Sequence, residues 1–401
     1  MRKLNNKKLG VILLLMIALI LVLIASIPSV YCADDNNSIA SDLENSVYES
    51  LGGIDFGGLD ECIQELNKDS QAIFGGDSFF DKVTALINGE FSTDTTSFFS
   101  AILSLFFGEI AGFLPMLCII IAITILCSLV GNIRSDVGSE SVGRIVDFVC
   151  YGIVIVIVSG CVFSLLGEVG QAIAAIKKQM DIIFPILLTL VASVGGTVTV
   201  GMFQPSLALF SNIIIQIFNF VLVPLFTFMF VFSVVGNMTN SVSLNKFNAT
   251  FRSIFKWVAG ICFSIFMGVV MVQGVVAGNF DNVSIRATKF ALKSYVPILG
   301  GYLSDGFNIV MASSVLIKNA IGGVGIFLAL SLIVVPIIKI AILGLGLKLT
   351  AAILEPMTKS KISDFLMNVS KNVNMLVVII AGVGFMYIVS IGMLLISANL
   401  G

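Results

Sequence analysis

The hydrophobic positions of this chain follow two patterns that divide it into two parts. Between residues 38 and 90, apolar side chains recur at helical spacing among polar ones, as in Ile39, Leu43, Val47 and Leu51. Glycine pairs separate these repeats, so the pattern predicts several short amphipathic helices. Beyond residue 97 the chain runs through apolar stretches of about 20 residues or more, each long enough to cross a ~30 Å hydrocarbon core.

The long apolar stretches predict a polytopic α-helical membrane protein of the all-α class. The expected spans are residues 109–131, 146–167, 183–203, 210–235, 257–278, 321–347 and 374–397. Seven spans is the central estimate within a range of six to eight. The composition agrees, because 57% hydrophobic and 11% charged residues give more apolar surface than a soluble fold of 401 residues can bury.

The amino terminus has the layout of a secretory signal peptide. Arg2, Lys3, Lys7 and Lys8 precede an apolar run over residues 9–27, and small or polar residues follow it. Residues 1–33 are therefore the expected signal peptide, with cleavage after Cys32 or Ala33. An uncleaved first membrane span remains the alternative.

Charge separates the next segment from the rest of the chain. Residues 34–96 contain fourteen acids and two bases, so their net charge is 2 − 14 = −12, whereas the whole chain carries only −2. We expect residues 34–97 to form an acidic extracytoplasmic helical segment, either a contact module or a flexible vestibule, and residues 98–401 to form the membrane domain.

The predicted topology contains one conflict. An outside N-terminal segment followed by seven alternating spans would place the loop carrying Lys246, Arg252 and Lys256 on the outer side, against the positive-inside rule. An additional span or a re-entrant hairpin, within residues 183–235 or 296–317, would change the parity. The sequence leaves both possibilities open.

Residues 283–325 mix bases, a proline, a glycine pair and an acid with apolar blocks, a combination that a lipid-facing helix tolerates poorly. A re-entrant or broken helix at 296–317 would resemble the ligand sites of transporters, with Asp305 paired to Lys318 or Arg286. An interfacial loop with an amphipathic helix is the alternative. The candidate functional positions are Arg286, Pro297, Gly300, Gly301, Asp305, Lys318 and Glu355. Lys339, inside a predicted span, raises the same question of charge at membrane depth.

Two further sets of residues predict helix packing. Asn212, Gln216 and Asn219 share one helical face, which favours interhelical hydrogen bonds or the lining of a polar pathway. Small residues every fourth position predict close helix packing or oligomerisation. These residues are Gly260, Ser264 and Gly268.

The residues do not favour an enzyme. The chain has no histidine, which excludes a Ser-His pair and the HExxH zinc motif, and its seven cysteines include no CxxC pair. No GxxxxGK[ST] phosphate loop is present. We therefore predict no catalytic, cofactor-binding or metal-binding residues, no cofactor and no nucleic-acid partner.

Seven segments, in order and spacing over nearly the whole chain, resemble the stage III sporulation protein AE family of spore-forming bacteria. They are FPILLTLVASVGG (184–196), FQP (203–205), VQGVVAG (272–278), SIRATKF (284–290), VPILGGYLSDG (296–306), LIKNAIGGVG (316–325) and KLTAAILEP (348–356). The signal peptide ahead of an acidic segment is also similar to the layout of that family.

The resemblance implies a non-enzymatic, multi-pass subunit of a secretion-like channel that links mother cell and forespore and supports forespore development. The implied location is the mother-cell membrane around the engulfed forespore. The implied partners are the other membrane proteins of the stage III sporulation A operon, their secretion-type ATPase and a forespore-side membrane protein, with lipid around the spans. An independent secondary transporter of a small solute is the alternative function.

Overall fold

The computed structural model describes residues 37–90, 95–135, 140–238, 245–295, 300–356 and 361–397. Within these ranges every regular element is a helix, in agreement with the all-α prediction. The predicted signal peptide, residues 1–33, lies outside the described residues.

Four short helices form an N-terminal module. They are α2 (Asn37–Gly52), α3 (Gly57–Gln64), α4 (Lys68–Phe74) and α5 (Phe79–Ile87). Their apolar faces are buried, with Leu51, Leu59 and Phe79 at most 1% exposed. The side chain of Ser78 accepts a hydrogen bond from the Asp81 N–H and so caps α5. The predicted breaks at Gly52-Gly53 and Gly75-Gly76 are confirmed, whereas Gly57 and Gly58 begin α3 and the break between α3 and α4 contains no glycine.

The rest of the chain consists of long antiparallel helices. They are α6 (Thr95–Ser135), α7 (Glu140–Ser193), α8 (Thr197–Ile217), the π-helix η1 (Phe218–Leu222), α9 (Val223–Met238), α10 (Asn245–Tyr295), α11 (Gly300–Leu354) and α12 (Lys361–Ser397). The segments α8, η1 and α9 follow one another without a break. Six helices in the described part of the chain are therefore long and apolar enough to cross a membrane.

Six is the lower limit of the predicted range, and the difference from seven arises at residues 183–203. That stretch is not a separate crossing, because it forms the end of α7, a turn at Gly195 and Gly196, and the start of α8. The polar residues between the two apolar runs of α7 suggested a loop. They remain helical since they pair with neighbouring segments: Lys178 contacts Glu65 at 2.7 Å and Asp181 accepts a hydrogen bond from Ser211.

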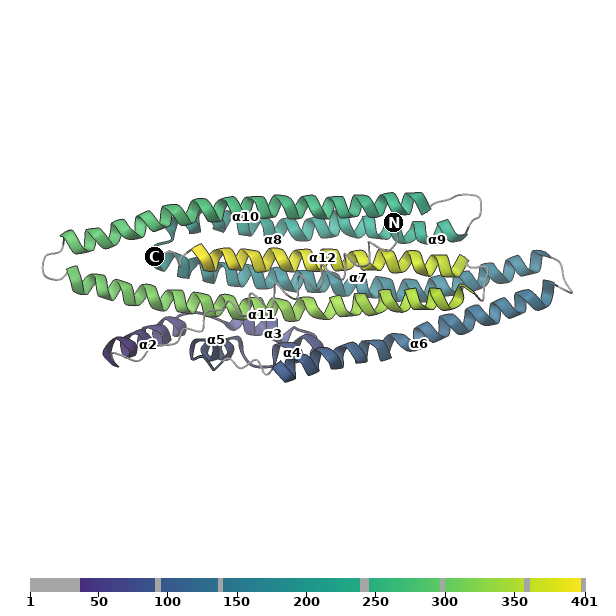
Figure 1. Cartoon of the computed structure of the whole chain (residues 1–401), viewed down its shortest axis with the longest axis horizontal. Helices are drawn as coiled ribbons and strands as arrows, with labels where there is room; N and C mark the ends of the chain where they lie inside the picture. Colours follow the sequence, from purple (N-terminus) through teal and green to yellow (C-terminus); the bar gives the residue numbers. More distant parts are fainter. Residues whose placement is uncertain are drawn as a thin grey trace.

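The antiparallel order sorts the connections between the long helices to two ends of the bundle (Figure 1). Residues 136–139, 239–244 and 357–360 connect helices at one end, whereas residues 194–196 and 296–299 connect them at the other. With six spans and an outside N-terminal module, the loop before Lys246 falls on the inner side. The conflict with the positive-inside rule therefore disappears without a re-entrant hairpin.

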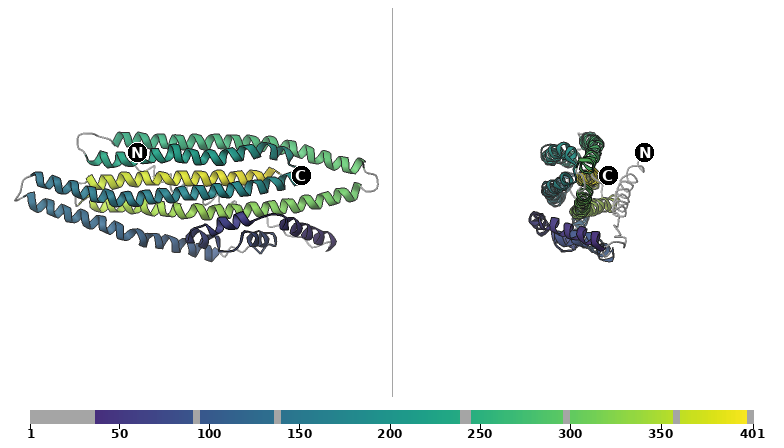
Figure 2. Two further views of the ribbon diagram at one scale, coloured as in Figure 1. Left: turned by 180° about the vertical axis from the view of Figure 1, so that it is seen from behind. Right: turned by 90° about the vertical axis from the view of Figure 1, so that its left-hand side faces the viewer.

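The helices α11 and α12 form the centre of the bundle. Their backbones approach closely at glycines: an added Cβ at Gly384 would lie 2.1 Å from Ile333, and one at Gly322 would lie 2.6 Å from Leu395. The N-terminal module lies against the first half of α11 on one side of the bundle (Figures 1 and 2). A ring contact between Phe74 and Phe327, with centroids 5.6 Å apart, is part of that interface.

The segment predicted as re-entrant or broken, residues 296–317, lies partly outside the described residues. From Gly300 onward it belongs to α11, which continues unbroken to Leu354. A break in residues 296–299, which include Pro297, stays a prediction.

Candidate functional site

Three ionisable side chains from three long helices meet inside the bundle. The ammonium nitrogen of Lys339 on α11 lies 3.0 Å from Oε2 of Glu168 on α7 and 3.4 Å from Oε1 of Glu109 on α6. The three side chains are 16%, 35% and 19% exposed, respectively, so the cluster is largely removed from the surface of the chain. We refer to these three residues as the charge cluster.

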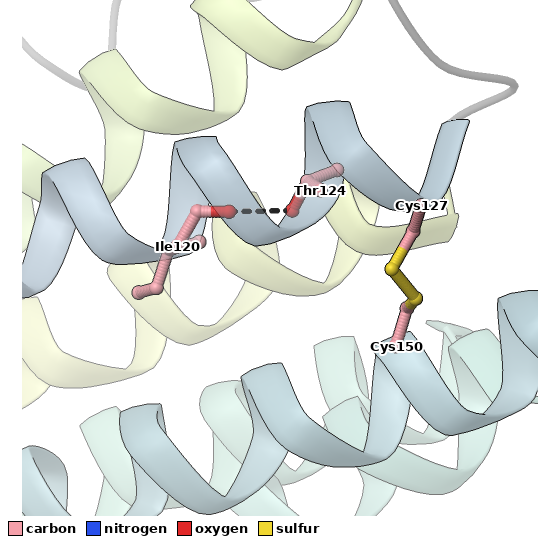
Figure 3. The surroundings of a disulfide bond; sticks show 4 residues. All are labelled: Ile120, Thr124, Cys127 and Cys150. Carbon is pink, nitrogen blue, oxygen red and sulfur yellow. Dashed lines mark hydrogen bonds between the residues drawn. A yellow bond between two sulfur atoms is a disulfide. The ribbon is translucent and has the colours of Figure 1, made fainter. Parts of the chain in front are cut away.

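The register of the α6–α7 hairpin brings the two glutamates to the same level. Nearer the loop, Cys127 and Cys150 form a disulfide between the helices (Figure 3), and eleven residues further along each helix the sulfur atoms of Met116 and Cys161 lie 2.9 Å apart. Seven more residues along each helix lead to Glu109 and Glu168. Steps of seven and eleven residues are close to two and three helical turns, so one seam contains all three pairs.

Lys339 stands between the two carboxylates and joins the hairpin to α11. Burying two carboxylates together is unfavourable unless a cation compensates them, and one ammonium group compensates one of the two charges. With all three groups ionised, the cluster has a net charge of −1. Its chemistry is therefore that of ion pairing, with one carboxylate charge left uncompensated within the cluster.

A cavity of about 370 Å³ adjoins the charge cluster and includes Glu168 in its wall. It lies between α3, α4, α7 and α11, where the N-terminal module meets the long helices. Its polar lining consists of Glu65, Asn67, Ser70, Glu168, Gln171, Lys178 and Gln179. The amide of Gln179 donates to the Gly325 carbonyl at 2.7 Å, whereas its own oxygen, also buried, has no hydrogen-bond partner. The cavity thus presents both hydrogen-bond donors and acceptors.

Two residues of the cavity wall, Cys62 and Pro336, have particular chemical properties. Burial raises the pKa of the Cys62 thiol, which keeps that sulfur protonated and weakly nucleophilic. Pro336 has no backbone N–H, so the carbonyl of Leu332 lacks its usual helical donor. Both line the cavity, Pro336 about one helical turn and Leu332 about two turns before Lys339.

The structure disperses the positions that the sequence proposed as one functional group. Arg286 is exposed on α10, and Glu355 is exposed just after α11. Lys318 is fully buried, and its ammonium group donates to the Leu395 carbonyl of α12 at 2.9 Å. Lys318 therefore ties α11 to the end of α12.

Residues 300–305 form the first turns of α11, and nothing is described of their side chains. Asp305 and Lys318 are thirteen residues apart on this one helix, a rise of about 20 Å. An ion pair between them within the chain is therefore wrong, and a pair between Asp305 and Arg286 stays a prediction. Gly300 and Gly301 mark the start of α11, and Pro297 lies outside the described residues.

The predicted packing residues lie on the outside of the chain. Asn212 and Gln216 on α8 and Asn219 on η1 are exposed, and the Asn212 amide donates to the Ala208 carbonyl of its own helix. On α10, all three small residues are exposed. They are Gly260, Ser264 and Gly268. Neither set packs against another helix of the same chain, so any packing role belongs to contacts with other molecules.

Sequence reasoning missed Glu109 and Glu168 as site residues because each adjoins the end of an expected span. A signal was present: both are single acids beside apolar runs, at similar distances from the loop at residues 136–139. The sequence does not show that α6 and α7 pair in this register, so it gave no reason to expect Glu109 and Glu168 close together.

The fold and the charge cluster together define a class, that of polytopic α-helical membrane proteins with a charged site among their long helices. The chain belongs to the stage III sporulation protein AE family, which it matches over residues 78–398. It is thus a sporulation membrane protein. The matched range starts at α5, so α2, α3 and α4 lie outside it.

A curated relative is the stage III sporulation protein AE of Bacillus subtilis (strain 168). The two proteins are 26% identical over 314 residues, which cover 78% of this chain and 79% of the relative. No solved structure matches the chain.

Proposed function

We propose that this chain is a non-enzymatic subunit of a multiprotein channel between mother cell and forespore, located in the mother-cell membrane around the forespore. The proposed partners are the other membrane proteins of the same sporulation operon and their secretion-type ATPase, with a forespore-side membrane protein reached through the complex. Family membership supports the sporulation context. The subunit role is supported by the surface of the chain itself.

The observation that carries the subunit role is the length of the exposed apolar stripe on α10. Large apolar side chains are exposed from Phe247 to Phe290, which are 43 positions apart, and include Trp257, Ile265 and Val275. At 1.5 Å per residue the stripe is about 65 Å long, more than twice a ~30 Å hydrocarbon core. Even at a tilt of about 40° it would span roughly 50 Å along the membrane normal.

Part of that stripe therefore lies outside the hydrocarbon at any membrane depth. Exposed apolar surface in water marks contact with other proteins. The helix α6 repeats the observation on a smaller scale, since its exposed apolar side chains run from Phe99 to Val130, 31 positions or about 46 Å. A protein that works alone in a bilayer has no need for such stripes, whereas a subunit of an assembly covers them with its neighbours.

Charge supports one orientation of the proposed subunit. The end of the bundle with the loops at 136–139, 239–244 and 357–360 has the basic positions Arg134, Arg144, Lys246, Arg252, Lys256, Lys348, Lys359, Lys361 and Lys371. Five acids lie near the same loops: Asp136, Glu140, Asp147, Glu355 and Asp364. The opposite end has fewer bases, among them Arg286, Lys289 and Lys293 in the last turns of α10, and adjoins the acidic N-terminal module. The positive-inside rule therefore favours a cytoplasmic basic end and an extracytoplasmic module facing the intermembrane space.

A secondary transporter of a small solute is the second candidate, and the charge cluster beside a polar cavity favours it. Intramembrane ionisable groups are a common feature of ion-coupled transport. In that case the isolated chain would be sufficient for activity, and the exposed stripes would be left without an explanation.

Affinity purification of a tagged chain from sporulating cells in mild detergent tests the proposal. We expect the companion membrane proteins and the ATPase to co-purify in stoichiometric amounts. Two variants, Phe247→Ser and Phe290→Ser, change the ends of the α10 stripe, and at least one of these ends lies outside the hydrocarbon. The variant whose substituted end lies outside the hydrocarbon should recover fewer companions than Val310→Ser, a matched control at an exposed apolar position on α11.

A different outcome would replace the subunit role. If the tagged chain elutes alone, and the purified protein moves a small solute in liposomes in a manner that depends on Glu168, then the transporter is correct and the channel subunit is wrong.

A further inference from the structure

Among the described residues, the exposed amide face of α8 and η1 has no hydrogen-bond partner on another helix, and the Asn212 amide donates to the Ala208 carbonyl of its own helix. Residues 197–236 include no charged residue, yet Asn212, Gln216 and Asn219 all point outward from this stretch. Apolar side chains surround them on the same surface, among them Leu209 at 62% and Phe220 at 78% exposure. An amide facing lipid leaves polar groups unsatisfied, so this surface favours contact with another protein.

The π-helix η1 contains Asn219, the last residue of the amide face, and changes the direction in which the side chains after it point. A π turn inserts one extra residue into the α-helical register. Phe226 and Phe230 of α9 remain buried, and the exposed surface continues at Phe228 and Val231. The polar part of the outer surface is thereby confined to α8 and the start of η1.

A second exposed face lies on α10 and is lined by small residues. A Cβ added to Gly260 or Gly268 would have no neighbouring atom within 4 Å, so no described residue of this chain occupies the space beside them. Ser264 lies between them and is also exposed. Small residues at this spacing permit close approach of a second helix backbone.

The contacts between α8–α9 and α10 fix the relative heights of these two faces. Phe210 packs on Phe266 with ring centroids 4.9 Å apart, and Phe232 packs on Phe247 at 6.2 Å. In this antiparallel pair, Gln216 lies level with the residues near Gly260, and Asn212 with those near Ser264. The amide face and the small-residue face therefore lie at the same height along the bundle.

The same contacts show that the two faces point in opposite directions. At about 100° per residue, Asn212 and Gln216 lie roughly 160° and 120° around α8 from Phe210, which faces α10. Gly260 and Ser264 lie about 120° and 160° around α10 from Phe266, which faces α8. The view along the bundle shows α8 and α10 side by side as one layer (Figure 2). One edge of this layer bears amides and the other bears small residues.

We propose that copies of this chain associate side by side, with the α10 small-residue face of one copy packed against the α8–η1 amide face of the next. This inference rests on the proposed role as a subunit of a membrane assembly and identifies a second copy as one neighbour. Close approach at Gly260 and Gly268 exposes backbone carbonyls of α10, and the amides donate hydrogen bonds to them. Because the faces are level, neighbouring copies need no displacement along the membrane normal.

The contact is heterologous, since two different faces of the chain meet. Repetition of such a contact gives a closed ring if the rotation closes. It also covers the middle of the α10 apolar stripe. A contact of α8 with α8 about a two-fold axis, or amides that line water, would each leave the α10 face open.

Cysteine crosslinking in native membranes tests the contact. The test variant combines Gln216→Cys with Gly260→Cys in a chain whose natural cysteines are replaced by alanine. Its ability to support sporulation is checked first. A heterologous contact predicts a ladder of dimers and higher oligomers with the double variant after mild oxidation, and less than one tenth of that product with either single variant. The matched control pairs Gly260→Cys with Leu114→Cys, an exposed position on α6, and should give no ladder.

Each other crosslinking result overturns the inference. Self-crosslinking of the single Gln216→Cys variant would indicate a two-fold contact. Rapid reaction of that cysteine with a membrane-impermeant thiol reagent, without any crosslink, would indicate amides in a water-filled path.

A second measurement retains the wild-type cysteines. Gly260→Leu fills the space on α10 without contacting the rest of the chain, so the monomer should fold with unchanged helical content. Native mass measurement should then show assemblies with fewer copies, whereas Gly152→Leu, also in open space on another helix, should not change the copy number. Companions that co-purify with a single copy of this chain would overturn this inference and leave the proposed function intact. A crosslinked ladder of this chain without co-purifying companions would support this inference and contradict the proposed function.

Discussion

The central pair α11–α12 and the outer helix α10 have similar apolar composition but opposite surroundings. In the most apolar part of α11 and of α12, 67% of residues are buried within the chain, against 11% in α10. Most apolar residues in that part of α11 or α12 therefore contribute to the fold, whereas most of those on α10 meet lipid or another protein, with Phe255, Phe266 and Val270 as buried exceptions. The comparison teaches that hydrophobicity identifies a membrane helix without revealing what the helix contacts.

Several charged residues follow the same division, although Arg252 and Asp281 of α10 are bound to α12 and α8. Lys318 and Lys339 of α11 are inside the bundle and bound to other helices, whereas Arg286 and Lys256 of α10 are exposed. Substitutions in the centre should thus change stability, and substitutions on α10 should change association. Four experiments test this difference.

The largest effect is expected for Lys339→Met, which removes the cation between Glu109 and Glu168. Removing one partner of a fully buried ion pair costs about 3–5 kcal/mol, and the partial exposure of these side chains lowers the expected loss to about 2–3 kcal/mol. Denaturant titration of the protein in mild detergent, followed by circular dichroism, measures this loss.

The matched control combines Lys339→Met with Glu109→Gln and Glu168→Gln. This triple variant leaves no unpaired charge and should regain most of the lost stability. A single variant as stable as the wild type would show that the charge cluster is well hydrated.

The next effect compares glycines on the two regions. Gly384→Ala places a Cβ 2.1 Å from Ile333 between α12 and α11, and overpacking of this kind costs about 1–3 kcal/mol. Gly260→Ala on α10 meets open space and should be neutral or stabilising by about 0.5–1 kcal/mol, because alanine favours the helix. The same titration measures both variants, and equal losses would contradict the difference between centre and periphery.

A smaller effect is expected where α10 is tied to the centre. Asn372 of α12 accepts hydrogen bonds from Arg252 of α10 at 2.7 and 3.2 Å and donates to Ser233 of α9 at 2.9 Å. Asn372→Ala should cost about 1–2 kcal/mol, because buried polar groups lose their partners. Limited proteolysis should then cut near residues 239–244 faster than in Asn374→Ala, and unchanged cleavage would contradict a role in holding α10.

The smallest effect concerns the disulfide of the α6–α7 hairpin. In the proposed orientation its loop faces the cytoplasm, where thiols stay reduced. Alkylation of intact sporulating cells should therefore find Cys127 and Cys150 as free thiols, with the disulfide of Figure 3 formed only on oxidation. Cys127→Ala should leave the stability of the reduced protein nearly unchanged. Added oxidant should join the two cysteines, since their Cα atoms are 6.4 Å apart. A disulfide already present in cells would favour the inverted orientation.

The sequence was sufficient for several features of this fold. Helical spacing and glycine pairs located the short N-terminal helices, and apolar length located the long ones. The sequence-based prediction was wrong at α7, where the charged residues between two apolar runs suggested a loop. These residues are Glu168, Lys177, Lys178 and Asp181. Those residues remain helical because Glu65, Lys339 and Ser211, distant in the chain, supply their partners.

The candidate site was less accessible from the sequence. Lys339 was noticed as a charge inside a predicted span, but its partners were not. Asp305 and Lys318, proposed as partners, lie along one helix. Spacing within a chain says little about contacts between helices, because such contacts depend on register and on the height at which each helix is packed.

The sequence alone determined that this is a multi-pass helical membrane protein of the sporulation family with an acidic N-terminal segment. Apolar length and charge distribution report directly on solvent preference, which is a property of each segment. Only the tertiary structure decided that the described residues form six helices long and apolar enough to cross, that Glu109, Lys339 and Glu168 meet, and that no described element covers the outer face of α10. Those features depend on which helix faces pack together. The packing of the faces is determined by contacts between residues far apart in the chain.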